Sequence, residues 1–306
     1  MTSSAMTNGH VIQTRALTKR YGDVRAVDGV NLEVRTGDVY GFLGANGSGK
    51  TTTVRMLLGL VLPTSGEAEV LGRPMPTARS SVLPRIGSLV EGPAAYPHLS
   101  GSANLALLDA TGSDRRPRLE RRNRIAISLE QVGLDPADRR PVRAYSQGMR
   151  QRLGLAAALM RRPTLLILDE PSNGLDPQGI QEIRALLLQL NSQGTTIFLS
   201  SHLLAEIEQM CSHVGMLRSG KLILQEHLDT LLQPTGLATV RTPDVAHCTS
   251  LLGGYVVSVD GDRLLVRAED PARLNAYLVA EGVRVDEIGP HRRTLEQVVL
   301  EAEARA

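Results

Sequence analysis

The sequence has 306 residues, of which 42% are hydrophobic and 22% charged, and a net charge of +2. Such a composition is typical of a globular protein and argues against disorder. The balanced charge disfavours a general nucleic-acid binder, which would project a strong positive field. Two cysteines, Cys211 and Cys248, are too few for a disulfide framework, so we expect two reduced thiols.

The first ten residues, Met1 to His10, are small and polar, and we expect them to form a disordered tail. They lack the basic start and the apolar stretch of a signal peptide. The longest apolar run, Leu153 to Met160, is much shorter than the roughly twenty apolar residues of a membrane-spanning helix. The sequence therefore predicts a chain that does not cross a bilayer alone.

A large α/β domain is expected over residues 11–233. Its first buried strand is the apolar run Val39–Leu43, which leads into a glycine-rich turn and then into a helix over Thr51–Leu60. From about residue 93 to 160 the pattern is helical and rich in arginine, without the alternation of a strand. We interpret this stretch as a helical subdomain inserted into the core.

Two further apolar runs, Thr164–Leu168 and Thr195–Leu199, have the character of strands buried on both faces of a parallel sheet. Between them, apolar residues recur at helical spacing, and Gly194 closes the helix. These apolar residues are Ile180, Ile183, Leu187 and Leu190. Alternating strands and helices predict a doubly wound α/β core, in which ligands bind beyond the carboxyl ends of the strands.

Residues 234–306 have a different pattern and are expected to form a small α+β domain. Tyr255–Val266 contains two β-rich runs around an Asp-Gly turn at 260–261, which favours a hairpin. Thr294 and Gln297 have the spacing of a capping box before a last helix. The order strand, helix, hairpin, helix, strand and helix is consistent with a ferredoxin-like arrangement, but no chemistry can be read from it.

The glycine-rich turn after the first strand has the pattern of a phosphate-binding loop, G-x-x-x-x-G-K-[ST]. Its residues are Gly44, Ala45, Asn46, Gly47, Ser48, Gly49, Lys50 and Thr51. Glycines allow successive backbone N–H groups to point at one anion, and the following helix directs its positive N-terminus to the same place. Lys50 can reach the β- and γ-phosphates, the Thr51 hydroxyl can bind Mg²⁺, and Thr52 completes the expected nucleotide-binding set. The position between a strand and a helix disfavours a chance glycine-rich turn.

The apolar strand Leu165–Leu168 ends in two acids, Asp169 and Glu170. Asp169 is expected to hold Mg²⁺, directly or through water, and Glu170 to polarise the attacking water as general base. Taken alone, a solvated acidic turn would be an equally good interpretation. Beside a phosphate-binding loop, the pair favours a magnesium–nucleotide site.

Beyond these motifs, the sequence resembles the ATPases of ABC transporters over nearly all of residues 11–233. Residues 145–149, Tyr-Ser-Gln-Gly-Met, resemble the ABC signature, whose consensus is L-S-G-G-Q. Residues 173–176 resemble the D-loop, and residues 200–202, Ser-Ser-His, resemble the switch-histidine segment. Tyr21 stands where the family has an aromatic residue that stacks on adenine.

The resemblance implies a P-loop NTPase (RecA-like) core with an N-terminal antiparallel β region, an inserted helical ABC subdomain and a small α+β C-terminal domain. It also implies that two ATPase domains, either two copies or one copy and a homologous subunit, face each other head to tail around ATP. Ser146 and the backbone near Gly148 would contact the γ-phosphate held by the opposite domain. His202 would contact the γ-phosphate held by its own domain and maintain the transition-state geometry.

The same resemblance implies a partner and a location. Closure around ATP and reopening after hydrolysis would drive an integral membrane permease subunit. The chain would then be a peripheral subunit at the cytoplasmic face of the cell membrane, without a role in nucleic-acid binding.

Two departures from the family pattern stand out. Tyr145, Gln147 and Met149 replace the usual Leu, Gly and Gln of the signature, whereas the contact-making Ser146 and Gly148 are kept. In the loop that links the nucleotide site to the membrane partner, Glu91 takes the place of the usual Gln. A carboxylate can bind Mg²⁺ and order water, but when ionised it cannot donate a hydrogen bond.

The Glu91 variant resembles the ATPases of bacitracin- and lantibiotic-resistance exporters. This likeness implies export of a drug, an antibiotic peptide or another amphipathic substrate. The alternative is that Glu91 is an ordinary loop acid and that the alignment is displaced by a residue or two.

Six arginines lie close together in the expected helical subdomain: Arg115, Arg116, Arg118, Arg121, Arg122 and Arg124. A solvated helix face is the favoured interpretation. Contact with anionic lipid or with acidic groups of the partner is the alternative, and no aromatic residues are interleaved as base stacking would require.

Two other functional classes compete with transport. One is a soluble ABC ATPase that acts on ribosomes or nucleic acid, but the chain carries neither a second cassette nor a long coiled coil. The other is a nucleotide sensor without turnover, which the presence of both Glu170 and His202 disfavours.

Overall fold

The computed structural model describes residues 9–90, 92, 95–111 and 118–305. The chain divides into two compact units, one ending at Leu228 and one spanning Asp229–Arg305, and each is described by itself. β1 begins at His10, and residues 1–8 of the expected tail lie outside the described part. Within the described ranges, no helix has both the length and the apolar character needed to cross a membrane.

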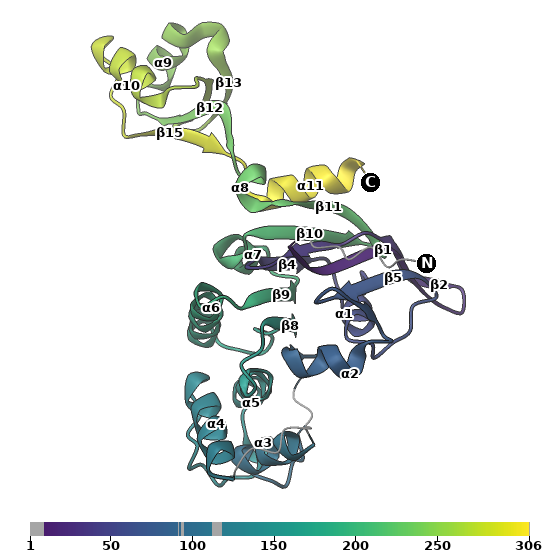
Figure 1. Ribbon diagram of the computed structural model, residues 1–306. Coiled ribbons are helices and arrows are strands. Elements are labelled where there is room, and N and C mark those ends of the chain that lie inside the picture. The colour runs from purple at the N-terminus through teal and green to yellow at the C-terminus, as the bar shows by residue number, and fades with distance from the viewer. Residues whose placement is uncertain (1–8, 91, 93–94, 112–117, 306) are drawn as a thin grey trace. The chain divides into compact units, whose positions relative to one another are not determined.

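A six-stranded sheet in the order β11-β10-β4-β9-β8-β7 forms the centre of the large unit (Figure 1). Its strands are β4 (Val39–Leu43), β7 (Ile86–Leu89), β8 (Leu165–Asp169), β9 (Thr196–Ser201), β10 (His213–Arg218) and β11 (Lys221–His227). Neighbouring strands are parallel, except that β11 runs antiparallel to β10. The doubly wound parallel core expected from the sequence is therefore confirmed.

Helices cover both faces of this sheet, which explains why its central strands are continuously apolar. In Figure 1, α6 (Pro177–Ser192) and α7 (Leu204–Met210) lie on one side, and α1 (Lys50–Leu57) lies on the other. The helix expected over Thr51–Leu60 is shorter than predicted, because Gly59 adopts a positive φ of 66° just beyond its end.

A second, antiparallel sheet belongs to the N-terminal half of this unit, in the order β2-β1-β5-β6, with β3 paired to β1. Its strands are β1 (His10–Tyr21), β2 (Val24–Val30), β3 (Glu33–Arg35), β5 (Ser65–Val70) and β6 (Arg73–Met75). Side chains from both sheets share one hydrophobic core around Tyr40, Phe42 and Phe198. This core fixes the loop between β4 and α1 relative to the rest of the unit.

A helical subdomain interrupts the core between β7 and β8, as expected. Its helices are α3 (Gly101–Ala110), α4 (Arg118–Gln131) and α5 (Gln147–Leu159), with a 3₁₀ turn at Val142–Ala144. The short helix α2 (Arg79–Val82) and the 3₁₀ turn Leu83–Arg85 precede β7.

Two arginines of the cluster have a structural partner rather than a solvated position. Arg121 Nε donates to Asp109 Oδ2 at 2.7 Å, and Arg124 Nη2 donates to both carboxylate oxygens at 3.0 Å. Asp109 is buried at the end of α3. Burial alone would raise the pKa of this carboxyl, but the hydrogen bonds from Arg124 and Arg121 lower it overall. The favoured solvated-face interpretation is thus wrong for Arg121 and Arg124, which join α4 to α3, while Arg115 and Arg116 lie outside the described residues.

The C-terminal unit has one four-stranded antiparallel sheet in the order β13-β14-β12-β15. Its elements are α8 (Leu228–Leu231, which begins at the unit boundary), β12 (Pro234–Arg241), α9 (Val245–Leu252), a 3₁₀ turn (Gly253–Tyr255), β13 (Val256–Asp260), β14 (Arg263–Arg267), α10 (Pro271–Ala280), β15 (Glu287–Arg292) and α11 (Leu295–Arg305). Counted from β12, the strand order is fourth, first, third, second, which is the ferredoxin-like arrangement expected from the sequence.

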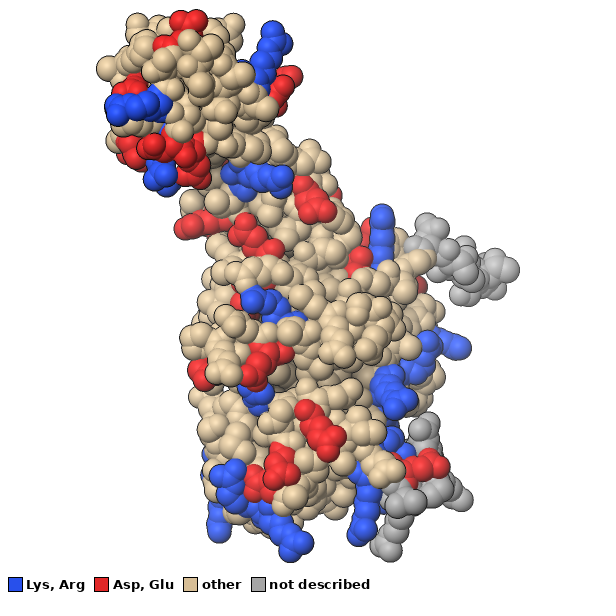
Figure 2. Space-filling view, turned by 90° about the vertical axis from the view of Figure 1, so that its left-hand side faces the viewer, with Lys and Arg blue, Asp and Glu red and all other residues tan. Residues whose placement is uncertain are grey.

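Two local sequence signals in this unit are also confirmed. Asp260 pairs with Arg263, so the hairpin turns over two residues, and Gly261 supplies a positive φ of 58°. Thr294 N donates to Gln297 Oε1 at 3.0 Å and Gln297 N donates to Thr294 Oγ1 at 3.2 Å, which is a capping box. On the face shown in Figure 2, acidic and basic side chains are interspersed among uncharged ones in both units.

Candidate functional site

The loop between β4 and α1 encloses the side chain of Lys50. Lys50 Nζ donates to the carbonyl oxygens of Gly44 at 2.6 Å and Ala45 at 3.3 Å, and the residue is only 5% exposed. Gly49 has a φ of 109°, and an added Cβ would collide with the Ala26 carbonyl oxygen. Only glycine fits at position 49, because the loop lies so close to β2 at this point.

A buried hydroxyl in this loop has no partner. Ser48 Oγ is inaccessible to solvent and makes no hydrogen bond within the described part of the chain. A Cβ built on Gly44 would lie 2.6 Å from it. The glycine-rich loop therefore holds a hydroxyl without a partner among the described residues, which fits a hydrogen bond donated to a phosphate oxygen.

The acid at the end of β8 lies against the start of α1. Thr51 Oγ1 donates to Asp169 Oδ2 at 2.8 Å, and Ser200 Oγ donates to Asp169 Oδ1 at 2.5 Å. Adjacent hydroxyl and carboxylate oxygens are the donors that Mg²⁺ prefers. The arrangement fits the expected metal ligands Thr51 and Asp169.

Glu170 leaves the strand through a strained backbone. Its φ is 51°, and its N–H donates to Ser200 Oγ at 3.0 Å and to Ser200 O at 3.2 Å. Its side chain lies between Lys50 and His202. Oε1 is 3.4 Å from Lys50 Nζ, and Oε2 is 2.8 Å from His202 Nδ1. The predicted base, phosphate lysine and switch histidine therefore meet in one cluster.

A cavity of about 380 Å³ opens beside this cluster. Thr51, Asp169 and Glu170 line one part of it, and Gln147 and Arg150 of α5 line another. The arrangement can hold a magnesium–phosphate group and place a carboxylate next to it.

Comparison with known proteins agrees with this geometry. The ABC transporter family model matches residues 27–173. The bacitracin transport ATP-binding protein BcrA of Bacillus licheniformis is 48% identical over 222 residues, which are 72% of this chain and 71% of that protein. The lantibiotic transport ATP-binding protein SrtF of Streptococcus pyogenes is 40% identical over 219 residues, 72% of this chain and 92% of that protein.

The chain belongs to the ABC transporter ATP-binding proteins.

Such a subunit binds ATP and couples its hydrolysis to transport across a membrane. A solved structure, cbiO1 of Clostridium perfringens, which is part of the ABC transporter complex cbiONQ, has 27% sequence identity and a TM-score of 0.64. The match covers 73% of this chain and 90% of that chain.

The unusual signature of this ABC ATPase has a structural explanation. Tyr145 is buried, its hydroxyl next to Gly101 at the start of α3, so the aromatic ring is part of the subdomain core. Ser146 remains exposed and caps α5 by accepting from Met149 N at 3.2 Å. The Gln147 side chain covers Gly174 so closely that a Cβ there would clash with it, which couples the signature to the D-loop.

Not every predicted residue joins the cluster. Tyr21 lies at the end of β1 with 48% of its surface exposed, and Lys19 Nζ is 4.9 Å from its ring centroid. Ser146 and Gly148 are at the N-terminal end of α5, and Thr52 follows Thr51 in α1. Glu91 lies outside the described residues, so its proposed contact with Mg²⁺ stays a prediction.

Three polar residues of the site were missed by the sequence interpretation. Ser200 holds both Asp169 and the Glu170 backbone, as described above. Gln151 Nε2 donates to the carbonyl oxygens of Glu170 at 3.1 Å and Pro171 at 2.9 Å. Glu206 Oε2 accepts hydrogen bonds from Ser172 Oγ at 2.6 Å and from Ser201 Oγ at 3.1 Å. Four-residue spacing after Gln147 and after His202 is the only signal that the sequence offers for Gln151 and Glu206.

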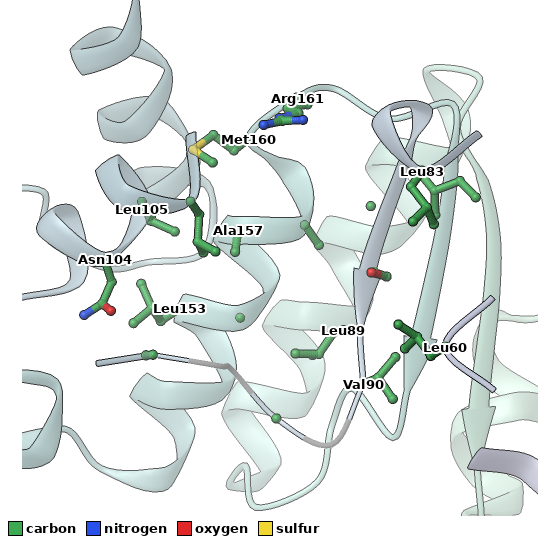
Figure 3. A pocket seen from close by; sticks show the side chains of 18 residues that line it. Leu60, Leu83, Leu89, Val90, Asn104, Leu105, Leu153, Ala157, Met160 and Arg161 are labelled. Atoms are coloured by element: carbon green, nitrogen blue, oxygen red, sulfur yellow. The ribbon is translucent and has the colours of Figure 1, made fainter. Parts of the chain in front are cut away.

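A second cavity, of about 360 Å³, lies between the helical subdomain and the core (Figure 3). Leu89 and Val90, at the end of β7, line it from the core, and Leu105, Leu153 and Ala157 line it from α3 and α5. Most of the residues that line it are apolar.

Proposed function

We propose that this ATPase hydrolyses ATP with Glu170 as general base and His202 as the γ-phosphate contact, and that it powers an exporter of antibiotic-like molecules. The observation that carries the catalytic part is the cluster in which Lys50 Nζ and His202 Nδ1 lie 3.4 Å and 2.8 Å from the two oxygens of Glu170. In it, phosphate-binding and water-activating groups are brought to one point, as phosphoryl transfer requires.

Each residue then has a role at the phosphate. The loop from Gly44 to Thr51 receives the β- and γ-phosphates through its N–H groups, and Lys50 exchanges its carbonyl partners for phosphate oxygens. Mg²⁺ would be held by Thr51 and Asp169, with Glu91 as a further predicted ligand. When bound, Mg²⁺ neutralises charge on the phosphates. Glu170 accepts the proton of the attacking water.

The second half of the site comes from another subunit in this proposal. Ser146, exposed at the N-terminal end of α5, would reach the γ-phosphate held by a second copy or by a homologous ATPase. Tyr21, exposed at the end of β1, would stack on adenine. A dimeric structure is known for a similar bacterial ABC transporter cassette, MJ0796, and this supports the arrangement.

A permease is the proposed membrane partner, and it would keep the ATPase at the cytoplasmic face of the membrane. The 360 Å³ cavity between the core and the helical subdomain can receive an apolar helix from such a subunit. The names of the similar proteins, bacitracin and lantibiotic transport ATP-binding proteins, support export of an antibiotic peptide or another amphipathic molecule.

The base is tested by Glu170→Gln, which keeps the shape of the side chain but removes the proton acceptor. We expect turnover to fall about 10²- to 10⁴-fold, because that is the usual contribution of general acid–base catalysis, while ATP binding persists. The measurement is phosphate release by the full chain with its permease, together with ATP retention on gel filtration. Normal turnover in this variant would remove Glu170 from the base position.

The partner surface is tested by a matched pair of substitutions. Leu108 and Leu188 are each 39% exposed, but only Leu108 lines the cavity between core and helical subdomain. We expect Leu108→Asp to weaken copurification with the coexpressed permease about tenfold, because an unpaired carboxylate would be buried against the partner. Leu188→Asp should copurify like the unmodified chain, and equal losses in both variants would contradict this docking position.

A further inference from the structure

The further inference concerns Glu206 in the first turn of α7. Only 9% of this residue is exposed, and its Oε2 accepts from Ser172 Oγ at 2.6 Å and from Ser201 Oγ at 3.1 Å. The other oxygen, Oε1, is buried without a hydrogen-bond partner among the described residues. A half-satisfied buried carboxylate is costly for folding and calls for an explanation.

The two serines that Glu206 joins flank the reacting groups. Ser172 is two residues beyond Glu170, and Ser201 immediately precedes His202. Because His202 Nδ1 also lies 2.8 Å from Glu170 Oε2, the contacts close into a ring through both turns. Glu206 is the one member of this ring that belongs to neither turn.

The direction of the hydrogen bonds shows what Glu206 does in the ring. Leu203 N donates to Ser201 Oγ at 3.0 Å, so the oxygen of this hydroxyl is engaged and its hydrogen is free for Glu206. Glu206 Oε2 therefore acts as an acceptor for two hydroxyl donors. A glutamine would keep one oxygen for both hydroxyls, but a neutral amide is a weaker acceptor than a carboxylate, and its NH₂ group would be buried without a partner.

The surroundings make these bonds effective. Ile183, Leu187 and Leu199 line a small, mostly apolar cavity with Glu206, and Arg184 also lines it. In apolar surroundings a hydrogen bond is stronger than in water, and the geometry it sets is correspondingly better defined.

We propose that Glu206 is a positioning residue, which braces the turn after β8 against the turn after β9 and so holds Glu170 and His202 at their mutual distance. The proposal rests on the roles of Glu170 and His202 given under the proposed function. Glu206 itself touches neither nucleotide nor water in this role. Its effect reaches the reaction through Ser172 and Ser201.

The test compares Glu206→Gln with Glu208→Gln, the same change at an exposed position of the same helix. We expect Glu206→Gln to lower kcat about tenfold, because both serine hydrogen bonds lose their charge-assisted strength and an amide NH₂ is buried without a partner. KM for ATP should stay within about twofold, because the phosphate loop and Tyr21 are untouched. Glu208→Gln should match the unmodified chain in both constants.

A second set of variants separates positioning from general destabilisation. In a chain with Ser172→Ala and Ser201→Ala, Glu206→Gln should change kcat by less than about twofold, because the groups act as one unit. Should Glu206→Gln fail to fold, the two single serine variants replace it, and each is expected to lower kcat with KM unchanged.

Unaltered kcat in Glu206→Gln, or in both single serine variants where they replace it, would overturn the proposal. An undiminished tenfold effect in the chain without both serines would do the same. The proposed function fails separately, through normal turnover of Glu170→Gln, so the two failures are distinguishable.

Discussion

The carboxyl edge of the six-stranded sheet and the C-terminal unit use polar side chains in opposite ways. At the sheet edge, Lys50 and Asp169 are buried, Glu206 is half-satisfied, and Ser48 Oγ has no partner in the described part. In the C-terminal unit, the bidentate pair of Arg284 with Asp244 lies at the surface.

The difference teaches how the surroundings of polar side chains relate to their use. Single atoms without a hydrogen-bond partner, such as Arg241 Nε, also occur elsewhere in the described chain. At the sheet edge, however, a buried lysine and a buried carboxylate lie close to an unpartnered serine hydroxyl, at a cost in folding free energy, and such a cluster marks a site that a ligand can complete. The capping box and the surface pair of the C-terminal unit satisfy their own loops and helix ends, which is a structural use.

Lys50→Ala tests the sheet edge and has the larger expected effect of the two substitutions that probe this comparison. It removes the cation that faces both the phosphates and Glu170, and we expect turnover to fall at least about 10²- to 10³-fold, the usual cost of one charge-stabilising donor. Phosphate release and nucleotide binding by the full chain are the measurements. Lys221→Ala, at an exposed lysine, is the control. Undiminished turnover in Lys50→Ala would contradict a role of this buried lysine in the reaction.

Asp244→Asn tests the C-terminal unit and has the smallest expected effect. Hydrogen bonds from Arg284 hold the pKa of Asp244 well below its usual range. A lowered folded-state pKa stabilises the fold above the ordinary aspartate pKa of about 3.9, and this contribution is lost as the pH falls through the folded value. The variant should therefore have a lower Tm at pH 7, and its difference from the unmodified chain should shrink in acid.

Thermal melts over a pH series measure this difference, with Glu269→Gln, an exposed acid of the same unit, as control. Turnover of Asp244→Asn should stay within about twofold, as for most surface substitutions. A large loss of turnover without unfolding would show that Asp244 in the C-terminal unit affects the reaction at the sheet edge.

The parts that could be predicted from sequence are those whose signals are local. The phosphate loop lies between β4 and α1, and the capping box lies within four residues, so neighbours in the chain are also neighbours in space. The strand ends at Asp169 and Ser201 were predictable to within two residues, because continuous apolar runs identify a parallel sheet buried on both faces.

The parts that could not be predicted depend on contacts between distant segments. The sequence favours a solvated position for Arg121 and Arg124. Nothing near them in the sequence indicates that Asp109, 12 and 15 residues away, is the hydrogen-bond partner of both. Glu206 meets Ser172 only because β8 and β9 are neighbours in the sheet, although the residues are 34 positions apart. Such pairings follow from strand order, which periodicity does not reveal.

The left-handed backbone of Glu170 decides how its carboxylate is aimed. A side chain that continued the pleat of β8 would project into one of the packed layers beside the sheet. The φ of 51° instead swings the residue out of the strand direction, at a cost of about 1–2 kcal/mol for a residue other than glycine. The direction of the side chain is therefore set by the backbone φ angle of Glu170, which the hydrogen bonds from Glu170 N to Ser200 hold in place. If Glu170 is the base, as we propose, the backbone of the turn after β8 sets the direction of its carboxylate.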